Sequence, residues 1–285
     1  TRLVFNGALV DVEGDMNIDD VVDDDNIIHS NVDVSIDNNS VTVQGGTSTI
    51  SKDFGASSIK VADGIDKVAI VKGSSITLVG GDDKELISFE GEGEKAITVD
   101  GSLQLGDAAS NNTSGKLSTA VTVNKDGTMS VAGGTYEVTD VTMTEGSTFN
   151  VKDNGQANVD NMTLSGNSTI ASDTGRTLVT DMTVSDGAEH TLTGSVEVTN
   201  LTGKNGSVLN VGILGGEGTE SRKGSLVIGA ASQLNGMGIF LDPAWENGMT
   251  ITDASSLVFK NATVDAKIVA GQNSYVVFGD SVTDD

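Results

Sequence analysis

The sequence of 285 residues has no cysteine, a single proline and few aromatic residues (4%). Without cysteine the chain cannot form disulfide bonds or thiolate metal sites. Positive charge is scarce as well, since 16 Lys and Arg stand against 41 Asp and Glu, which gives a net charge of −25. This deficit argues against nucleic acids and anionic membrane surfaces as partners, because both are bound through basic patches. No apolar run approaches the roughly 18 residues of a membrane-spanning helix.

The residues that are abundant favour β-structure. Glycine occurs 36 times, and Thr, Val, Ser, Asn and Asp are frequent. These residues are weak helix formers, whereas short strands joined by tight turns accommodate them well. The composition therefore predicts an all-β fold.

Four consecutive segments of the chain align without a gap, and their starts are 21, 20 and 19 residues apart. The segments are Val138–Met143, Val159–Leu164, Val179–Val184 and Val198–Gly203. A fixed period near twenty residues is typical of stacked repeat architectures. Each unit is too short to build a core alone, so it must bury its apolar side against its neighbours.

Each repeat carries an apolar residue, a threonine and, in most copies, a second apolar residue in succession, as in Val141-Thr142-Met143. This alternation predicts a strand with one buried face and an outward threonine. The neighbouring outward position, two residues earlier, holds Asp or Asn. The threonine column comprises Thr122, Thr142, Thr163, Thr183 and Thr202, and the acid–amide column comprises Asp140, Asn161, Asp181 and Asn200.

A polar, Gly-bearing turn follows each of these strands and leads into a second apolar stretch. His190 falls in the column of Phe149, Ile170 and Leu209 within this stretch, which predicts a packing role for its side chain. Together the strands predict a parallel β-solenoid with coils of about 20 residues, formed by residues 1–285 as a single unit. Loop insertions are expected near residues 80–95, 212–224 and 242–248, where charged residues, or the only Pro and Trp, interrupt the period.

The two outward columns form the candidate surface for a ligand or for self-association. A row of outward threonines could match an ice lattice or a repeating polysaccharide, but Thr is also a good strand former that solubilises an exposed face. The Asp and Asn neighbours depart from the flat double-threonine surface of ice-binding solenoids. The candidate residues are Asp140, Asn161, Asp181, Asn200, Thr142, Thr163, Thr183 and Thr202.

No metal, cofactor or catalytic site is predicted. The acidic stretch at residues 11–25 fails the EF-hand pattern, because Asp20 stands at the required glycine and Asn26 at the required glutamate, and it leaves only weak Ca²⁺ binding open. Two histidines and no cysteine argue against zinc. The block from Phe278 to Asp284 resembles the nucleophile block of GDSL-type esterases, but Ser281 has no base to activate it within the chain. We therefore do not expect an enzyme.

The combination of coils of about twenty residues, acidity, absent cysteine, few aromatics and Gly/Thr/Asn/Ser-rich turns resembles the passenger domains of bacterial autotransporters, mainly the adhesin and self-association branch. The resemblance implies a right-handed parallel β-helix at the surface of a Gram-negative cell. It also implies translocation across the outer membrane by a C-terminal β-barrel, which would follow Asp285. Such passengers mediate adhesion, autoaggregation or biofilm formation. The signatures of their protease branch are not present.

Two other functions stay open at the level of the sequence. One is a β-helix that binds or cleaves a polysaccharide, although one Trp and two Tyr give few platforms for sugar stacking. The other is a structural surface-layer or matrix protein, which would assemble through Ca²⁺ bridges between acidic chains. The expected partners are accordingly a second copy of the chain, or a glycan or protein on a host or other surface.

Overall fold

The computed structural model describes residues 2–5, 32–37, 40–44, 48–50, 54–56, 58–61, 66–109, 113–185, 187–204, 206–213, 222–229, 233–234, 238–241, 256–260, 267–270 and 275–279. The described residues form strands and turns, and they contain no helix that is long and apolar enough to cross a membrane. The all-β prediction is confirmed for them. The acidic stretch at 11–25, the expected loop at 242–248 and Ser281 lie outside the described residues.

The strands before residue 110 are short. They are β1 (Arg2–Phe5), β2 (Val32–Asp37), β3 (Ser40–Gln44), β4 (Ser48–Ile50), β5 (Phe54–Ala56), β6 (Ser58–Val61), β7 (Lys67–Ile70), β8 (Ser75–Leu78), β9 (Lys84–Glu85), β10 (Ile87–Phe89), β11 (Ala96–Val99) and β12 (Ser102–Leu105).

The longest strands lie in the middle of the chain. The strands from residue 113 onward are β13 (Ser114–Leu117), β14 (Ala120–Val123), β15 (Thr128–Ala132), β16 (Thr135–Met143), β17 (Thr148–Lys152), β18 (Gln156–Leu164), β19 (Ser168–Val184), β20 (Glu189–Gly203), β21 (Val208–Val211), β22 (Gly224–Ile228), β23 (Gln233–Leu234), β24 (Gly238–Leu241), β25 (Ser256–Lys260), β26 (Lys267–Ala270) and β27 (Tyr275–Gly279).

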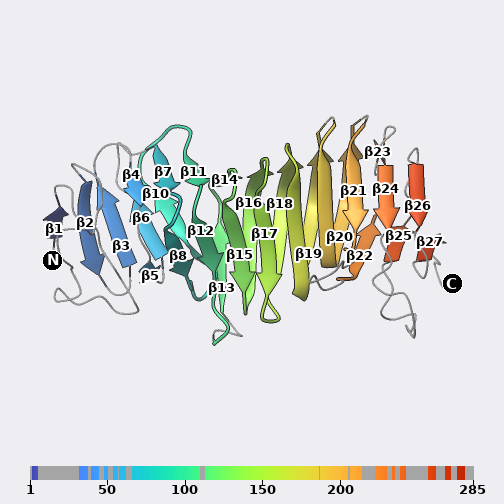
Figure 1. Cartoon of the computed structure of the whole chain (residues 1–285). Coiled ribbons are helices and arrows are strands. Elements are labelled where there is room, and N and C mark those ends of the chain that lie inside the picture. The colour runs from blue at the N-terminus through green and yellow to red at the C-terminus, as the bar shows by residue number, and fades with distance from the viewer. Residues whose placement is uncertain are drawn as a thin grey trace.

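Most strands belong to one parallel sheet of 22 strands. The sheet is all-parallel, and about ten of its strands wrap through 290° around an axis. In Figure 1 the strands follow one another along an elongated molecule, with β1 at one end and β27 at the other. Parallel neighbours need a long connection between them, and here the intervening strands on the other faces supply it.

The register of the central strands matches the sequence alignment. Val121, Val141, Met162, Met182 and Leu201 pair one after another and lie 20, 21, 20 and 19 residues apart. The predicted stacking of the repeats is confirmed at this column. A period-two pattern has only one register that buries all apolar side chains, because a slip of one residue would turn them to solvent.

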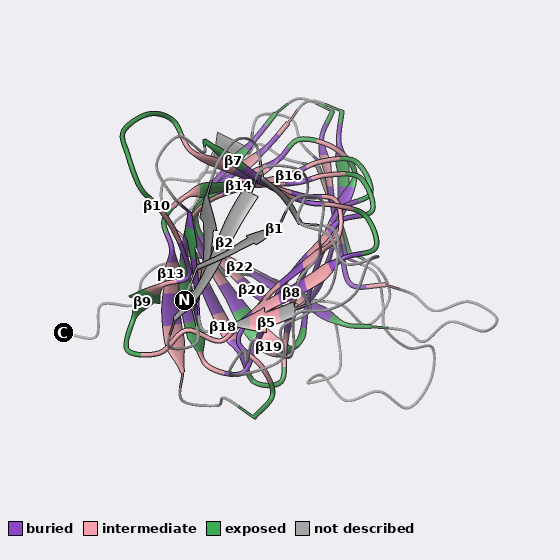
Figure 2. Ribbon diagram, turned by 90° about the vertical axis from the view of Figure 1, so that its left-hand side faces the viewer, coloured by how far each residue is buried: buried purple, intermediate pink, exposed green. Residues whose placement is uncertain are grey.

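The core lies on the inner side of the wrapped sheet. Strand β17 shows the alternation clearly, since Phe149 and Val151 are fully buried while Thr148 and Asn150 are half-buried on the outer side. Figure 2, which looks along the molecule, shows the strands arranged around the axis, with buried and less buried positions alternating along them. Burial of each Val, Leu or Ile side chain contributes about 1.5–3 kcal/mol, and the repeats share one continuous core.

Several of the turns between the two strands of a repeat share one backbone hydrogen bond. The N–H groups of Gly127, Ser147 and Ser207 donate to the carbonyl oxygen three residues earlier, at 2.9–3.2 Å. Gly146 and Gly206 take the left-handed conformation at this turn (φ 71° and 77°), which glycine allows because it has no Cβ to clash there. The earliest turn differs, since Asp126 rather than its glycine neighbour carries the positive φ of 64°.

The N-terminal strands depart from the predicted parallel coil. Strand β2 pairs antiparallel with both β1 and β3, whereas β3 pairs parallel with β6. Only residues 38–39 separate β2 from β3, and a connection of two residues can form a hairpin but not a parallel crossover, which needs a dozen residues or more. The prediction of one uninterrupted parallel solenoid over residues 1–285 is therefore wrong for this hairpin.

Residues 80–95, which the sequence analysis expects as a loop insertion, include two strands. Strand β9 pairs with β13, and β10 pairs with β6. Leu86 and Ile87 are fully buried, and the exposed residues of this segment are confined to 82–84 and 90–94. The charged residues conceal this short apolar segment in the sequence. For the expected insertion at 212–224, the structure places an antiparallel bridge between Ile213 and Arg222, and residues 214–221 lie outside the described part.

Tyr136 links three successive layers of the sheet. Its hydroxyl donates to the Val79 carbonyl oxygen at 2.7 Å and lies 2.7 Å from the Thr113 hydroxyl. Burial raises the pKa of this phenol, so it stays protonated and available as a donor. Gly106 makes room for the ring, since a Cβ at that position would come within 2.7 Å of the Tyr136 hydroxyl.

Replacing Tyr136 by phenylalanine is expected to lower the free energy of unfolding by about 1–3 kcal/mol, because the partly buried Val79 carbonyl loses its tyrosine donor. Urea unfolding followed by circular dichroism measures this loss. Thr113→Ala serves as the comparison, since it leaves the bond to Val79 in place and should cost less. Equal losses in the two variants would show that the Val79 bond is not the important one.

Candidate functional site

The predicted acid–amide column lies where the long strands turn from one face of the molecule to the next. In β18 and β19 the alternation of inward and outward residues breaks, and two successive residues are exposed at Asp160-Asn161 and Thr180-Asp181. The second member of each pair belongs to the predicted column. Asp140, Asn161, Asp181 and Asn200 pair in register on neighbouring strands, as the sequence predicts.

Hydrogen bonds join these four side chains in pairs, and we call the four residues the corner ladder. The Asn161 amide donates to Asp140 Oδ1 at 2.9 Å, and the Asn200 amide donates to Asp181 Oδ1 at 2.9 Å. Each carboxylate accepts at one oxygen in this arrangement and retains acceptor capacity at the other, while each amide retains a second N–H and an acceptor oxygen. Alternating donors and acceptors thus point outward along the corner.

The threonine column runs beside the corner ladder. Thr142, Thr163, Thr183 and Thr202 pair in register; the first three are half-buried and Thr202 is exposed. Thr122 continues the column, and Thr98 on β11 extends it by one more repeat. The sequence analysis misses Thr98 because the step to Thr122 is 24 residues rather than about 20. The signal is present, since Ile97 and Val99 flank Thr98 in the same apolar–Thr–apolar pattern.

A second threonine column, on the strands after the turn, also escapes the sequence analysis. Each of its threonines comes at most a few residues after the glycine of a Gly-bearing turn. An alignment of the polar positions, in addition to the apolar ones, would have found this column. Its members are half-buried and face outward from β15, β17, β19 and β20: Thr128, Thr148, Thr169 and Thr191.

His190 is buried as predicted, and its predicted column is right for Leu209 but wrong for Phe149 and Ile170. It pairs with Ser168 and Leu209, whereas Phe149 and Ile170 align with Leu192. The reason is a longer turn. Leu164 pairs with Val184 before the turn, and Ser168 pairs with His190 after it. The chain takes four steps from Leu164 to Ser168 but six from Val184 to His190, so the strand after the turn is displaced by two residues.

The His190 ring sits in the core as a neutral base. Its Nδ1 lies 2.8 Å from the Ser168 hydroxyl, and its Nε2 has no partner among the described residues. Burial lowers the pKa of the imidazole to about 4, although the nearby carboxylates of Glu145 and Glu189 act in the opposite direction. Ser168 and Glu189 also line a shallow hollow of about 280 Å³ on the outer surface.

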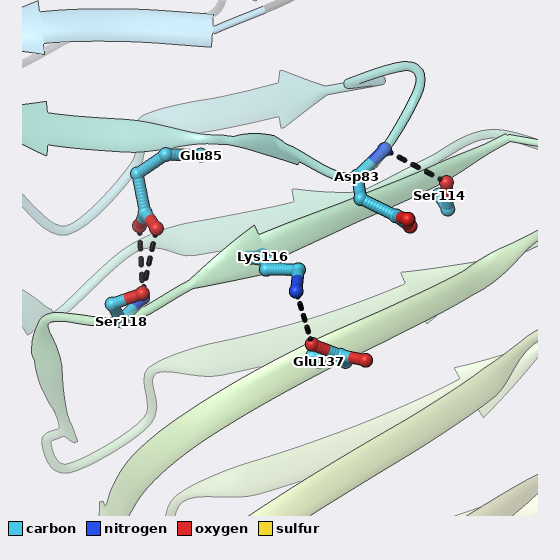
Figure 3. Close-up of polar contacts among 6 residues, drawn as sticks. All are labelled: Asp83, Glu85, Ser114, Lys116, Ser118 and Glu137. Carbon is cyan, nitrogen blue, oxygen red and sulfur yellow. Dashed lines mark hydrogen bonds and ion pairs between the residues drawn. The ribbon is translucent and has the colours of Figure 1, made fainter.

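A charged face includes Lys116 and Glu137, and Figure 3 shows the polar contacts of its side chains. Lys116 pairs with Glu137 at 3.1 Å, and this hydrogen bond, with the charge of Glu137, raises the pKa of the lysine. Glu85 accepts from the backbone N–H and the hydroxyl of Ser118 at 2.8 and 2.6 Å. The Asp83 N–H donates to the Ser114 hydroxyl at 3.1 Å.

The same face continues toward the C-terminal end as a groove of about 420 Å³. In-register pairing carries the column of Lys116 and Glu137 on to Asn158, Leu178 and Glu197. The groove is formed by side chains of three neighbouring strands, β18, β19 and β20. Its lining comprises Gln156, Asn158, Val159, Asp160, Arg176, Leu178, Val179, Thr180, Glu197 and Thr199.

No group of three or more His, Cys, Asp or Glu side chains suited to a metal ion occurs within the described ranges. The acidic stretch in which weak Ca²⁺ binding stays open lies outside those ranges. Protein-family models, curated proteins and solved structures were each compared with the chain, and none matches.

Proposed function

We propose that the chain is a right-handed parallel β-helix, a β-solenoid with coils of about twenty residues, and that it serves as the stalk of an extracellular bacterial cell-surface adhesin. On this proposal, copies on neighbouring cells associate through the corner ladder and lead to autoaggregation or biofilm formation. The observation that carries the proposal is the in-register alternation of Asp140, Asn161, Asp181 and Asn200 along one outward edge.

The alternation makes the corner ladder complementary to itself when two copies run antiparallel with all four residues in register. When two ladders run antiparallel, Asp140 of one copy faces Asn200 of the other, and Asn161 faces Asp181, so every carboxylate meets an amide donor. When two ladders run parallel in the same register, carboxylate meets carboxylate and the charges repel. An antiparallel pair has twofold symmetry, which is the commonest symmetry of protein dimers.

The internal hydrogen bonds of the ladder favour such an association. Asn161 and Asn200 are already held by Asp140 and Asp181, so fewer side-chain rotamers are lost on binding. Each contact is weak, but a rod presents many of them at once, and the contacts reinforce one another. The net charge of −25 opposes the approach of two copies. Association should therefore strengthen as salt is raised from low ionic strength, because the Debye length shortens to about 10 Å at 0.1 M.

Sedimentation velocity of the purified chain across concentration tests the proposal. We expect concentration-dependent dimers that persist in EDTA. The double substitution Asn161→Asp/Asn200→Asp, which makes the ladder all-acidic, should weaken the dimer at least tenfold, about 1.4 kcal/mol. Asp140→Asn/Asp181→Asn, which makes it all-amide, should preserve the dimer because amides both donate and accept.

The matched control is Asn150→Asp/Asn158→Asp, which adds the same charge outside the ladder. It should change the dimer constant by less than about twofold, 0.4 kcal/mol. An elongated monomer under every condition would overturn self-association. Association that requires Ca²⁺ would instead favour a structural surface-layer protein, and circular dichroism of each variant would show whether the fold is retained.

A further inference from the structure

The groove on the charged face has features that the proposed self-association does not use. It lies beside the corner ladder rather than on it and crosses three neighbouring strands. Two steps between parallel strands amount to about 10 Å, and the five residues from Gln156 to Asp160 span about 13 Å. The groove is thus long enough for a few units of an extended oligomer, but it is too small to hold a second folded domain.

The polar groups of the groove both donate and accept hydrogen bonds. The Gln156 amide donates to Asn158 Oδ1 at 2.9 Å, which orients the two amides along one wall. On the other side the Arg176 guanidinium lies 3.6 Å from the Glu197 carboxylate, and both side chains are about half exposed. Guanidinium, amide and carboxylate groups are planar and present paired donors or acceptors to a ligand.

Leu178 lies on the outer side in the middle of these polar groups. From Glu85 to Glu197 it is the only apolar residue of its column, whose other members are charged or amide side chains. Its side chain is half-buried, so part of the apolar surface remains open to the groove. A ligand that suits the site therefore needs a hydrogen-bonding edge and an apolar patch, with a few polar groups fixing its orientation.

The position of the groove excludes some ligand classes. Strand β18 pairs with β16 and β19, and β19 pairs with β20, so no free sheet edge is left here for an extended peptide to join. The groove has one cationic side chain against Asp160 and Glu197, and the whole chain carries −25, so a polyanion is repelled. Sugar rings combine hydroxyl edges, which donate and accept, with apolar C–H faces. They fit the remaining requirements.

We infer that the groove on β18, β19 and β20 is a binding site for a neutral polysaccharide, whose hydroxyls contact the Arg176–Glu197 pair and the Gln156–Asn158 amides while a ring face packs on Leu178. This ligand is distinct from the second copy of the chain that the corner ladder binds. The stalk would thereby hold an uncharged glycan and a neighbouring copy at adjacent surfaces of the same three repeats.

The chain itself offers a matched pair of variants for the test. Arg176→Ala/Glu197→Ala removes an ion pair from the groove, and Lys116→Ala/Glu137→Ala removes an equivalent pair farther along the same column, outside the groove; neither changes the net charge. The intact chain is first applied to an array of oligosaccharides that includes chitohexaose, cellohexaose, maltohexaose and the polyanion heparin. Calorimetry then measures the affinity of the best neutral probe.

We expect at least one neutral oligosaccharide to bind, with a loss of at least tenfold in Arg176→Ala/Glu197→Ala and in Leu178→Ala, and less than twofold in Lys116→Ala/Glu137→Ala. Circular dichroism confirms that each variant is folded. The inference is overturned if no neutral sugar on the array binds, if heparin alone binds, or if the groove variants bind as tightly as the intact chain. Sedimentation velocity without sugar measures self-association separately. Loss of glycan binding and loss of self-association can therefore be told apart.

Discussion

Replacing Gly194 by alanine is expected to lower the free energy of unfolding by more than about 4 kcal/mol, which is at the extreme of single substitutions. Gly194 lies in β20 at the place where the pairing with β19 shifts in register. Its φ is +70°, and an added Cβ would lie 2.0 Å from the Ser172 carbonyl oxygen. The Gly194 N–H also donates to the Lys223 carbonyl at 2.8 Å on the opposite side, so the backbone has no direction in which to move.

Gly187→Ala separates the two causes of this loss. Gly187 has nearly the same conformation, with φ of +69°, but an added Cβ would meet no atom within 4 Å. Only the cost of the left-handed backbone applies there, about 1–2 kcal/mol. Chemical denaturation of both variants, followed by circular dichroism, measures the difference. Similar losses would mean that the Ser172 carbonyl gives way at little cost and that the steric argument is wrong.

Acidification from pH 7.5 to pH 5 is expected to remove about 2 kcal/mol of stability through His190 alone. Burial lowers the pKa of its imidazole from the ordinary 6.5 to about 4, so the unfolded chain takes up a proton in this range while the folded chain does not. The stability is fully present above pH 6.5 and is lost as the pH falls toward 4. Protonation would place a charge beside Ser168 and leave the Nε2 proton without a described partner.

A His190→Leu variant isolates this contribution from the titration of the carboxylates. Leucine matches Leu209, the next member of the column, and does not titrate. The stability of the intact chain minus that of the variant should fall by about 2 kcal/mol between pH 7.5 and pH 5, with the carboxylate contributions cancelling. A difference that stays constant with pH would refute the buried neutral state. Proton NMR titration of the imidazole gives the folded pKa independently.

The outward columns of the central repeats were predictable from the sequence, and the physical reason is the period of two along a strand. Apolar residues on both sides of Thr142 or Thr163 leave only one face for burial, so the threonines and the corner ladder must point outward together. The steps of 19 to 21 residues then bring equivalent positions side by side. This reasoning needs no knowledge of distant contacts, because the pattern recurs in each repeat.

Pattern matching failed where the connections change length or where the local signal is short. The turn before His190 is two residues longer than its predecessor, so an alignment at constant offset wrongly placed the ring level with Phe149 and Ile170. The two residues between β2 and β3 enforce a hairpin at the N-terminal end. Strands β9 and β10 are so short that the surrounding charges hide them.

Composition and periodicity were enough to predict that the chain is all-β, that its central repeats stack with a period near twenty, and which residues of those repeats face outward. The packed repeats were needed to show that Asn161 and Asn200 bond to Asp140 and Asp181, that Tyr136 reaches the Val79 carbonyl, and that three strands form a groove. Periodicity fixes the face and the neighbour of a residue, because both follow from strand geometry. The choice of partner depends on side-chain rotamers and turn lengths, which are settled only when the repeats pack together.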